Sequence, residues 1–131
     1  MTRPNLVAGK NINLESINHN TSKAAITIRA VTTNTFNEFE EVIEQTHAKL
    51  MAESPSKLDA DGLESFWLEK KRKLHVWIPH AEIKEIDLWV SECVAYAQSS
   101  DFKEAVCKLE VLKTLTSQIP KNFSLKLENL F

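Results

Sequence analysis

Glycine is almost missing from this sequence, and its scarcity limits what the chain can form. Only Gly9 and Gly62 occur among the 131 residues, whereas average usage predicts about nine. Phosphate-binding loops, dinucleotide-binding turns and tight hairpins need glycine for a positive φ or for a close approach of the backbone. The sequence therefore excludes the nucleotide-binding motifs that depend on glycine-rich loops.

The charges are nearly balanced, with 16 basic and 18 acidic residues and a net charge of −2. This balance gives little attraction for DNA or RNA, so we expect no nucleic-acid partner. No stretch approaches the roughly 18 consecutive apolar residues that a membrane helix needs, so we expect no membrane span in this chain. The length suits one domain with a single core.

Apolar residues spaced three or four positions apart predict a helix in each of four segments. The first begins at Asn34 or Thr35 and ends just before Pro55, because the residue before a proline avoids the helical region. The second covers about residues 59–77, and Pro79 breaks the chain after it. Residues 70–73 within it are all basic, which indicates a solvated face or, alternatively, a docking patch for an anionic partner.

The third helix is predicted over residues 80–98, where the apolar spacing resembles a coiled-coil seam. The fourth follows Asp101, which together with Glu104 forms a variant of the capping box, and it is expected to stop at Pro120. The sequence then closes with an apolar tail over residues 124–131. Because such a tail is unfavourable in water, we expect it to fold back onto the helices.

The predicted fold is all-α, an up-down-up-down four-helix bundle with the C-terminal tail packed back on it, because short connectors join neighbouring antiparallel helices. Residues 35–131 form the bundle domain in this prediction. Residues 1–34 lack a clear period and carry four cations against one anion, so we expect a polar leader that is loosely ordered or partly helical.

Motifs along the second half of the chain, in this order, resemble a bacterial family of small helical proteins. They are the Trp-x-x-x-Lys-x-x-Leu run from Trp67, then His80-x-Glu82-Ile83, Asp101-Phe102-x-x-Ala105, and the ending Ser124-Leu125-x-Leu127-Glu128-Asn129-Leu130-Phe131. That family is classed only as a domain of unknown function and occurs chiefly in spore-forming bacteria. The resemblance covers about residues 35–131 and implies no reaction, cofactor or partner.

The resemblance also implies a location for the helical domain. Members of the family typically carry an N-terminal transmembrane anchor, which residues 1–34 do not contain. The domain is therefore expected outside the cytoplasm and membrane-associated if the natural chain has an anchor that this sequence lacks, and in the cytoplasm otherwise. An envelope or sporulation role follows in the same way from the resemblance alone.

His75, His80, Glu82 and Glu85 are the one cluster in the sequence that resembles a site. Pro79 separates the two histidines, so they do not share a regular helical face. A side chain at position 80 can cap the following helix, contact a ligand or partner, or bind a metal, and we expect capping or surface exposure. No spacing puts a base beside a nucleophile, so we predict no enzymatic activity, no cofactor and no metal.

The three tryptophans are the other candidates for a binding role. Trp67 and Trp77 lie on the apolar stripe of the second helix, which favours core packing over a stacking platform. Trp89 lies beside the seam of the third helix, so we expect it to be half exposed and to mark an interaction surface. Cys93 and Cys107 fall at one level of a helical hairpin but on different sides, which favours two free thiols over a disulfide and leaves an intermolecular bond through Cys107 as the alternative.

These observations predict a non-enzymatic helical module that acts in protein interaction or as a structural element, with an unknown protein partner or as a homodimer. Its contacts are expected at Trp89 and at an exposed aromatic start of the first helix. The alternative is a small-molecule sensor with a pocket near His80. The candidate residues for an interaction surface or pocket are Trp77, His80, Glu82, Trp89 and Phe131.

Overall fold

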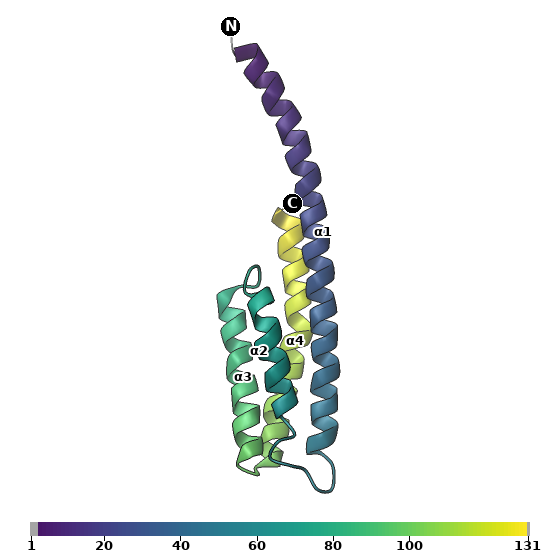
Figure 1. Cartoon of the computed structure of the whole chain (residues 1–131), viewed down its shortest axis with the longest axis vertical. Helices are drawn as coiled ribbons and strands as arrows, with labels where there is room; N and C mark the ends of the chain where they lie inside the picture. The colour runs from purple at the N-terminus through teal and green to yellow at the C-terminus, as the bar shows by residue number, and fades with distance from the viewer. Residues whose placement is uncertain (1–2, 131) are drawn as a thin grey trace.

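The computed structural model describes the backbone of residues 3–130 and the side chains of residue 20 and residues 22–123. The described backbone forms four helices joined by short connections: α1 (Arg3–Leu50), α2 (Asp61–Leu74), α3 (His80–Gln98) and α4 (Phe102–Leu130). Each helix runs antiparallel to the next, and α4 lies beside α1 (Figure 1). This arrangement confirms the predicted all-α, four-helix fold.

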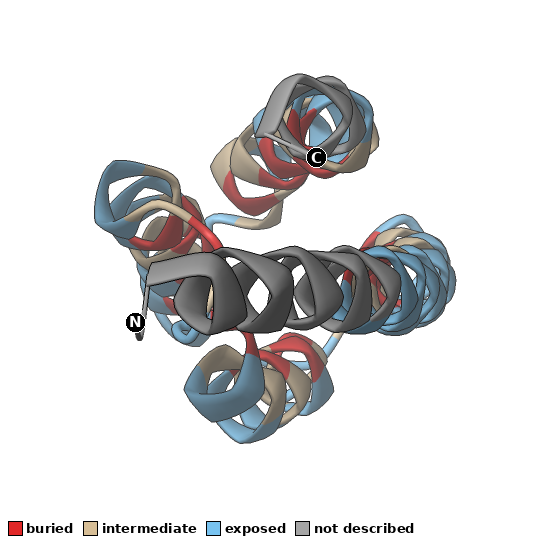
Figure 2. Ribbon diagram, turned by 90° about the horizontal axis from the view of Figure 1, so that it is seen from above, coloured by how far each residue is buried: buried red, intermediate tan, exposed pale blue. Residues whose placement is uncertain are grey.

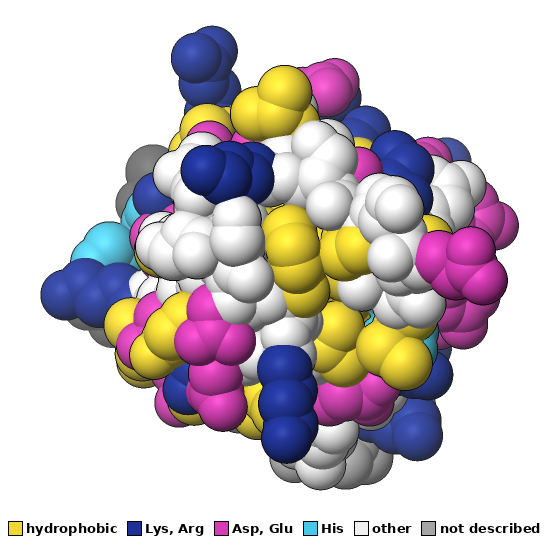
Figure 3. Space-filling model, turned by 90° about the horizontal axis from the view of Figure 1, so that it is seen from below, with side chains coloured by type: hydrophobic (Ala, Val, Ile, Leu, Met, Phe, Trp, Pro, Cys, Tyr) yellow, Lys and Arg dark blue, Asp and Glu magenta, His cyan; other side chains and the backbone are white. Residues whose placement is uncertain are grey.

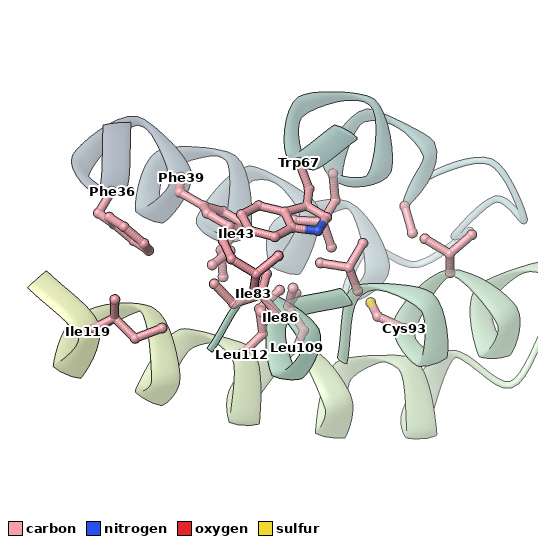
Figure 4. Packing of buried hydrophobic residues seen from close by; sticks show 14 of the residues in the cluster. Phe36, Phe39, Ile43, Trp67, Ile83, Ile86, Cys93, Leu109, Leu112 and Ile119 are labelled. Carbon is pink, nitrogen blue, oxygen red and sulfur yellow. The ribbon is translucent and has the colours of Figure 1, made fainter. Parts of the chain in front are cut away.

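The core lies where the inward faces of the four helices meet. Figure 2 shows the buried residues turned toward the middle of the bundle and the exposed ones turned outward. Apolar residues recur every three or four positions on each helix and are almost fully buried there, as in the row Phe36, Phe39 and Ile43 on α1. The same spacing places Leu109 and Leu112 of α4 and Ile83 and Ile86 of α3 in the core (Figure 4).

An aromatic cluster joins α1 to α2 inside this core. The ring of Phe39 lies 5.3 Å from that of Phe66 and 5.5 Å from that of Trp67, measured between centroids, and Phe36 lies 6.3 Å from Phe39. Phe36 and Phe39 are 2 % and 0 % exposed. The predicted exposed aromatic start of the first helix is therefore wrong, because these rings fill the space between α1 and α2.

The first helix begins much earlier than expected. α1 passes through residues 34 and 35 without a break and starts at Arg3. Within the residues whose side chains are described, Ala25 and Thr32 are buried and Ile28 packs against the core, so the inward stripe of α1 continues before Phe36. Packing along this stripe outweighs the modest helix propensity of its Thr, Ile and Asn residues.

The fourth helix does not stop at Pro120. α4 continues through this proline to Leu130, so the backbone does not turn back after residue 120 as the predicted tail required. Proline lacks the N–H that would bond to the carbonyl of Thr116. However, Ile119 and Phe123 on either side of it are both buried in the core, and their packing holds the two halves of the helix in line.

The connections use few residues and, over the described part of the chain, no glycine. α2 ends at Leu74, three residues earlier than predicted, so Trp77 belongs to the turn and not to a helix. α3 covers the predicted range of residues 80–98. At the start of α4, the backbone N–H of Glu104 donates to the Asp101 carboxylate at 3.3 Å, which confirms the predicted cap.

Candidate interaction surface on α3 and α4

The predicted site residues fall in two separate regions of the structure. Trp77, His80 and Glu82 lie in or next to the turn between α2 and α3, and Trp89 lies near the middle of α3. Phe131 is outside the described residues. The structure therefore does not bring Trp89 into one site with Trp77, His80 and Glu82.

In the turn, Trp77 anchors the connection to the bundle. Its indole N–H donates to the hydroxyl of Thr32 on α1 at 2.8 Å, and the ring is half-buried against the core. The neighbouring Ile78 is buried. Trp77 therefore closes one end of the core, in the structural role that the sequence favoured.

His80 opens α3 directly after Pro79, and its side chain is exposed. No side-chain hydrogen bond caps this helix, so of the two expected roles of His80, capping or surface exposure, the structure shows the exposure. The imidazole instead lies against that of His75, with 5.0 Å between the ring centroids. Glu82 is half-buried in the first turn of α3.

Trp89 lies on the side of α3 that faces α4, and it is half-buried. The Lys108 ammonium from α4 lies 5.4 Å from the centroid of the Trp89 ring and 5.7 Å from that of Tyr96. Glu92, between the two aromatic residues, pairs with the same ammonium at 3.5 Å. One lysine thus spans two aromatic faces and a carboxylate, which fixes their relative positions.

The local sequence explains this arrangement. Trp89 and Tyr96 are seven residues apart, so they lie on one face of α3 two turns from each other. Val111 follows Lys108 by three residues on α4, and its side chain is 41 % exposed. We call the group formed by Trp89, Glu92, Tyr96, Lys108 and Val111 the Trp89 surface.

The sequence predicted only Trp89 within this group. The spacing of seven residues between Trp89 and Tyr96 was the signal that could have added Tyr96. Lys108 could not be assigned, because its position beside Trp89 depends on the relative register of α3 and α4.

The basic residues of α2 form contacts within the chain. Lys71 donates to the Asp87 carboxylate at 2.8 Å, and Lys70 pairs with Glu38 at 3.5 Å. Asp87 also accepts a hydrogen bond from the indole N–H of the buried Trp67 at 2.7 Å. Two of the four cations thus connect α2 to its neighbours, which agrees with a salt-bridged face.

A shallow hollow of about 190 Å³ lies between α1 and α4, away from His80. Ile43 and Leu109 contribute its apolar part, and Glu44, His47, Glu110 and Lys113 its charged part. His47 and Glu110 face each other across it at 3.0 Å. The predicted pocket near His80 would need a hollow at the α2–α3 turn, whereas this one lies between the other two helices.

Glu44 and His47 form a Glu-x-x-His pair that sequence reasoning missed, a spacing found in carboxylate-bridged metal sites of helical bundles. Within the described residues, however, no three His, Cys, Asp or Glu side chains are close enough to hold one metal ion together.

The cysteines behave as predicted. Both are free: Cys93 is buried in the core (Figure 4) and Cys107 is exposed on α4. Burial raises the pKa of the Cys93 thiol from 9.0 to about 11, because the thiolate would lose its hydration.

Isolated apolar side chains also reach the surface elsewhere. The end of the bundle that carries the α1–α2 and α3–α4 connections shows apolar side chains among charged ones (Figure 3), and Met51 and Leu58 of the α1–α2 connection are exposed. Scattered apolar residues are normal on soluble proteins. Tryptophan and tyrosine at a surface are more typical of an interface.

Comparison with known proteins adds one finding. The family model described as "Domain of unknown function (DUF4363)" matches residues 25–130. No curated protein and no solved structure matches the chain. Separately, none of the helices, as far as the structure describes them, is both long and apolar enough to cross a membrane.

Proposed function

Since the chain belongs to the family described as Domain of unknown function (DUF4363), we propose a function for it from its surface: it is a non-enzymatic helical module that associates with another protein chain through the Trp89 surface. The observation that carries this proposal is the arrangement of the half-buried Trp89 and Tyr96 around one lysine at the α3–α4 junction. The first partner to test is a second copy of the chain.

The composition of the Trp89 surface supports association. Tryptophan and tyrosine dominate the binding energy of many protein interfaces, because they bury a large area and lose little conformational entropy. Trp89 and Tyr96 both pack partly against the core, so their rings are held before any partner binds. Val111, three residues after Lys108 on α4, adds an exposed aliphatic side chain.

The bundle interior supports the same proposal. A continuous cluster of buried apolar residues from all four helices fills it, so the inward faces serve packing. The side chains that remain available for recognition lie on the outside of the helices. This distribution favours association over the binding of a small molecule between the helices near His80.

Val111→Glu tests the proposal, with Leu68→Glu as the matched control. Both replace an exposed apolar residue by a carboxylate, at 41 % and 55 % exposure, but Leu68 lies on α2. In size-exclusion chromatography with light scattering, we expect the mass of the wild type to rise from 14.9 kDa toward twice that value with concentration. The control should do the same, and Val111→Glu should stay monomeric.

A monomeric wild type would exclude the second copy and leave a different protein as the partner. The tagged full-length chain should then capture a defined protein from its native host after cross-linking, with equal yield for Leu68→Glu and a strongly reduced yield for Val111→Glu. Equal capture by all three chains would refute the Trp89 surface as the binding site.

An envelope or sporulation setting forms the second part of the proposal, and it rests on the family resemblance. We expect the chain in native cells to fractionate with membranes or with developing spores. Recovery of the chain only in the cytosol of vegetative cells would contradict this setting without affecting the Trp89 surface.

A further inference from the structure

The two exposed imidazoles at the α2–α3 turn lie unusually close for residues separated by a proline. The ring centroids of His75 and His80 are 5.0 Å apart, and the ring planes are inclined by 33°. Both side chains are exposed, so an ion in solution can reach them. The helical spacing of the sequence did not predict this pairing, because the turn and not a shared helix face brings the rings together.

The backbone on both sides of the pair is fixed by the core. Leu74 immediately precedes His75 and is fully buried, and Ile78 in the turn is buried as well. The N–H of Ile78 donates to the carbonyl of Leu74 at 2.8 Å, and that of His75 to the carbonyl of Lys71 at 3.0 Å. With Trp77 bonded to Thr32 on α1, the turn has little freedom to separate the two rings.

Two neighbouring imidazoles form a recognisable ligand pair. Neutral imidazole donates a nitrogen lone pair to Cu²⁺, Ni²⁺ and Zn²⁺, and two such rings on a fixed backbone lose little entropy when they bind one ion. Water can fill the remaining coordination positions, because the site is open to solvent.

The donor atoms of the pair select among metal ions. The charges nearby are mixed: Arg72, Lys73 and Lys84 lie close in the sequence to the two histidines, and so do Glu82 and Glu85. The carboxylate of Asp87 is engaged by Lys71 at 2.8 Å. Two imidazole nitrogens do not supply the oxygen ligands that Ca²⁺ and Mg²⁺ need, whereas they suit Cu²⁺, Ni²⁺ and Zn²⁺.

We propose that His75 and His80 form a two-histidine site, open to solvent, for one divalent transition-metal ion of the Cu²⁺, Ni²⁺ and Zn²⁺ class. An ion held there links the end of α2 to the start of α3. Because the unfolded chain does not hold the rings together, the bound metal stabilises the bundle.

Isothermal titration of the full chain with Cu²⁺, and with Zn²⁺ in a second series, tests the site. His75→Gln and His80→Gln each remove one ligand, and His47→Gln on α1 is the matched control, because His47 lies in the hollow between α1 and α4. We expect one ion to bind per wild-type chain and per His47→Gln chain, with affinity at least about tenfold weaker in each of the other two variants. Mg²⁺ should give no binding heat.

Thermal unfolding gives an independent readout. Without metal, all four chains should unfold at similar temperatures, because the three histidines are partly or fully exposed. Added Zn²⁺ should raise the unfolding temperature of the wild type and of His47→Gln. It should leave the unfolding temperatures of His75→Gln and His80→Gln unchanged. The proposal is overturned if the wild type binds no metal, if either turn variant binds it as tightly as the wild type, or if His47→Gln abolishes binding.

Discussion

A single carboxylate, that of Asp87, joins two helices by satisfying two donors at once. It accepts from the indole N–H of Trp67 at 2.7 Å and from the Lys71 ammonium at 2.8 Å. Trp67 is 1 % exposed, so water cannot replace a lost acceptor for its N–H. At the residue scale, Asp87 therefore governs whether the large aromatic ring of α2 can remain in the core.

Asp87→Ala should destabilise the protein by about 1–3 kcal/mol, because it leaves the buried indole N–H of Trp67 unsatisfied. Asp87→Asn is the matched control: its amide oxygen can still accept from Trp67, so we expect a clearly smaller loss. Urea unfolding of both variants measures the difference. Equal losses would mean that the pairing with Lys71, and not the hydrogen bond to Trp67, carries the effect.

The two cysteines should differ in reactivity. Cys93 is fully buried with its pKa raised to about 11, whereas Cys107 is exposed. Iodoacetamide at pH 8 should therefore modify Cys107 in the native protein and Cys93 only after unfolding, as peptide mass spectrometry will show. Equal labelling rates of the two in the native state would contradict the burial of Cys93.

The pKa of Cys93 also predicts how stability depends on pH. The folded-state pKa of about 11 lies above the ordinary thiol value of 9.0, so the folded chain holds this proton more tightly than the unfolded chain. The contribution of the protonated Cys93 thiol to the free energy of unfolding is fully present below pH 9. It is lost as the pH rises from about 9 to 11. Cys93→Ala should make the alkaline loss of stability in urea unfolding shallower over this range.

At the scale of elements, the helix ends show how chemistry near a terminus decides where a helix stops. α3 ends in a Schellman motif: the N–H of Asp101 donates to the carbonyl of Tyr96 at 2.9 Å, and that of Ser100 to the carbonyl of Ala97 at 3.0 Å. Ser100 has φ of 60°, the left-handed conformation that usually takes glycine. Serine thus occupies the position at which many helices have a glycine, a residue that is scarce in this sequence.

Ser100→Gly should stabilise the protein by about 1 kcal/mol, because glycine adopts this conformation without the steric cost that a Cβ imposes. Ser99→Gly is the control, since Ser99 has φ of −87° and gains nothing from glycine. The unfolding temperature should therefore rise in Ser100→Gly and not in Ser99→Gly. A loss of stability in Ser100→Gly would show that the entropy of the unfolded chain outweighs the relief of strain.

Pro120→Ala should also stabilise the protein, by about 1–2 kcal/mol. Alanine restores the N–H that can bond to the carbonyl of Thr116, and it removes the contact between the proline ring and the preceding turn. Lys121→Ala, at an exposed neighbouring position, is the control and should change stability by less than about 0.5 kcal/mol. Destabilisation by Pro120→Ala would mean that the packing of Ile119 and Phe123 requires the local geometry of proline.

Helix ends also show how far sequence reasoning reached. The range of α3 was predicted because Pro79 and Ser99 mark both of its ends, and the inward stripes of all four helices followed from apolar spacing. The continuation through Pro120 could not be predicted, because it depends on long-range burial of Ile119 and Phe123 that overrides a local signal. The same limit applied to Lys108 in the Trp89 surface, because its position beside Trp89 depends on how α3 and α4 pack against each other.

At the scale of the whole molecule, the core joins all four helices into one packed unit. Phe39 on α1 touches α2 through Phe66 and Trp67 and belongs to the same buried cluster as Leu109 of α4. A defect at one of these residues should therefore weaken every helix of the unit together. Small domains with such a core usually unfold in one cooperative step.

Phe39→Ala should lower the free energy of unfolding by about 3–5 kcal/mol, because it removes a fully buried ring. Asn37→Ala, exposed on the same helix, should change it by less than about 0.5 kcal/mol. Helical circular dichroism and tryptophan fluorescence should report the same urea midpoint in each chain. Separate midpoints would show that α1 and the helices carrying the tryptophans unfold independently.

The neighbouring positions of α1 and α4 have a consequence for the order of events on the ribosome. α1 packs against both α2 and α4, yet α4 is synthesised only after α1, α2 and α3. The ribosome adds about 5–20 residues each second, so α1 and α2 can pair several seconds before α4 emerges. During that interval the side of Ile43 that α4 will cover faces water or a chaperone, and the bundle can close only after α4 has been synthesised.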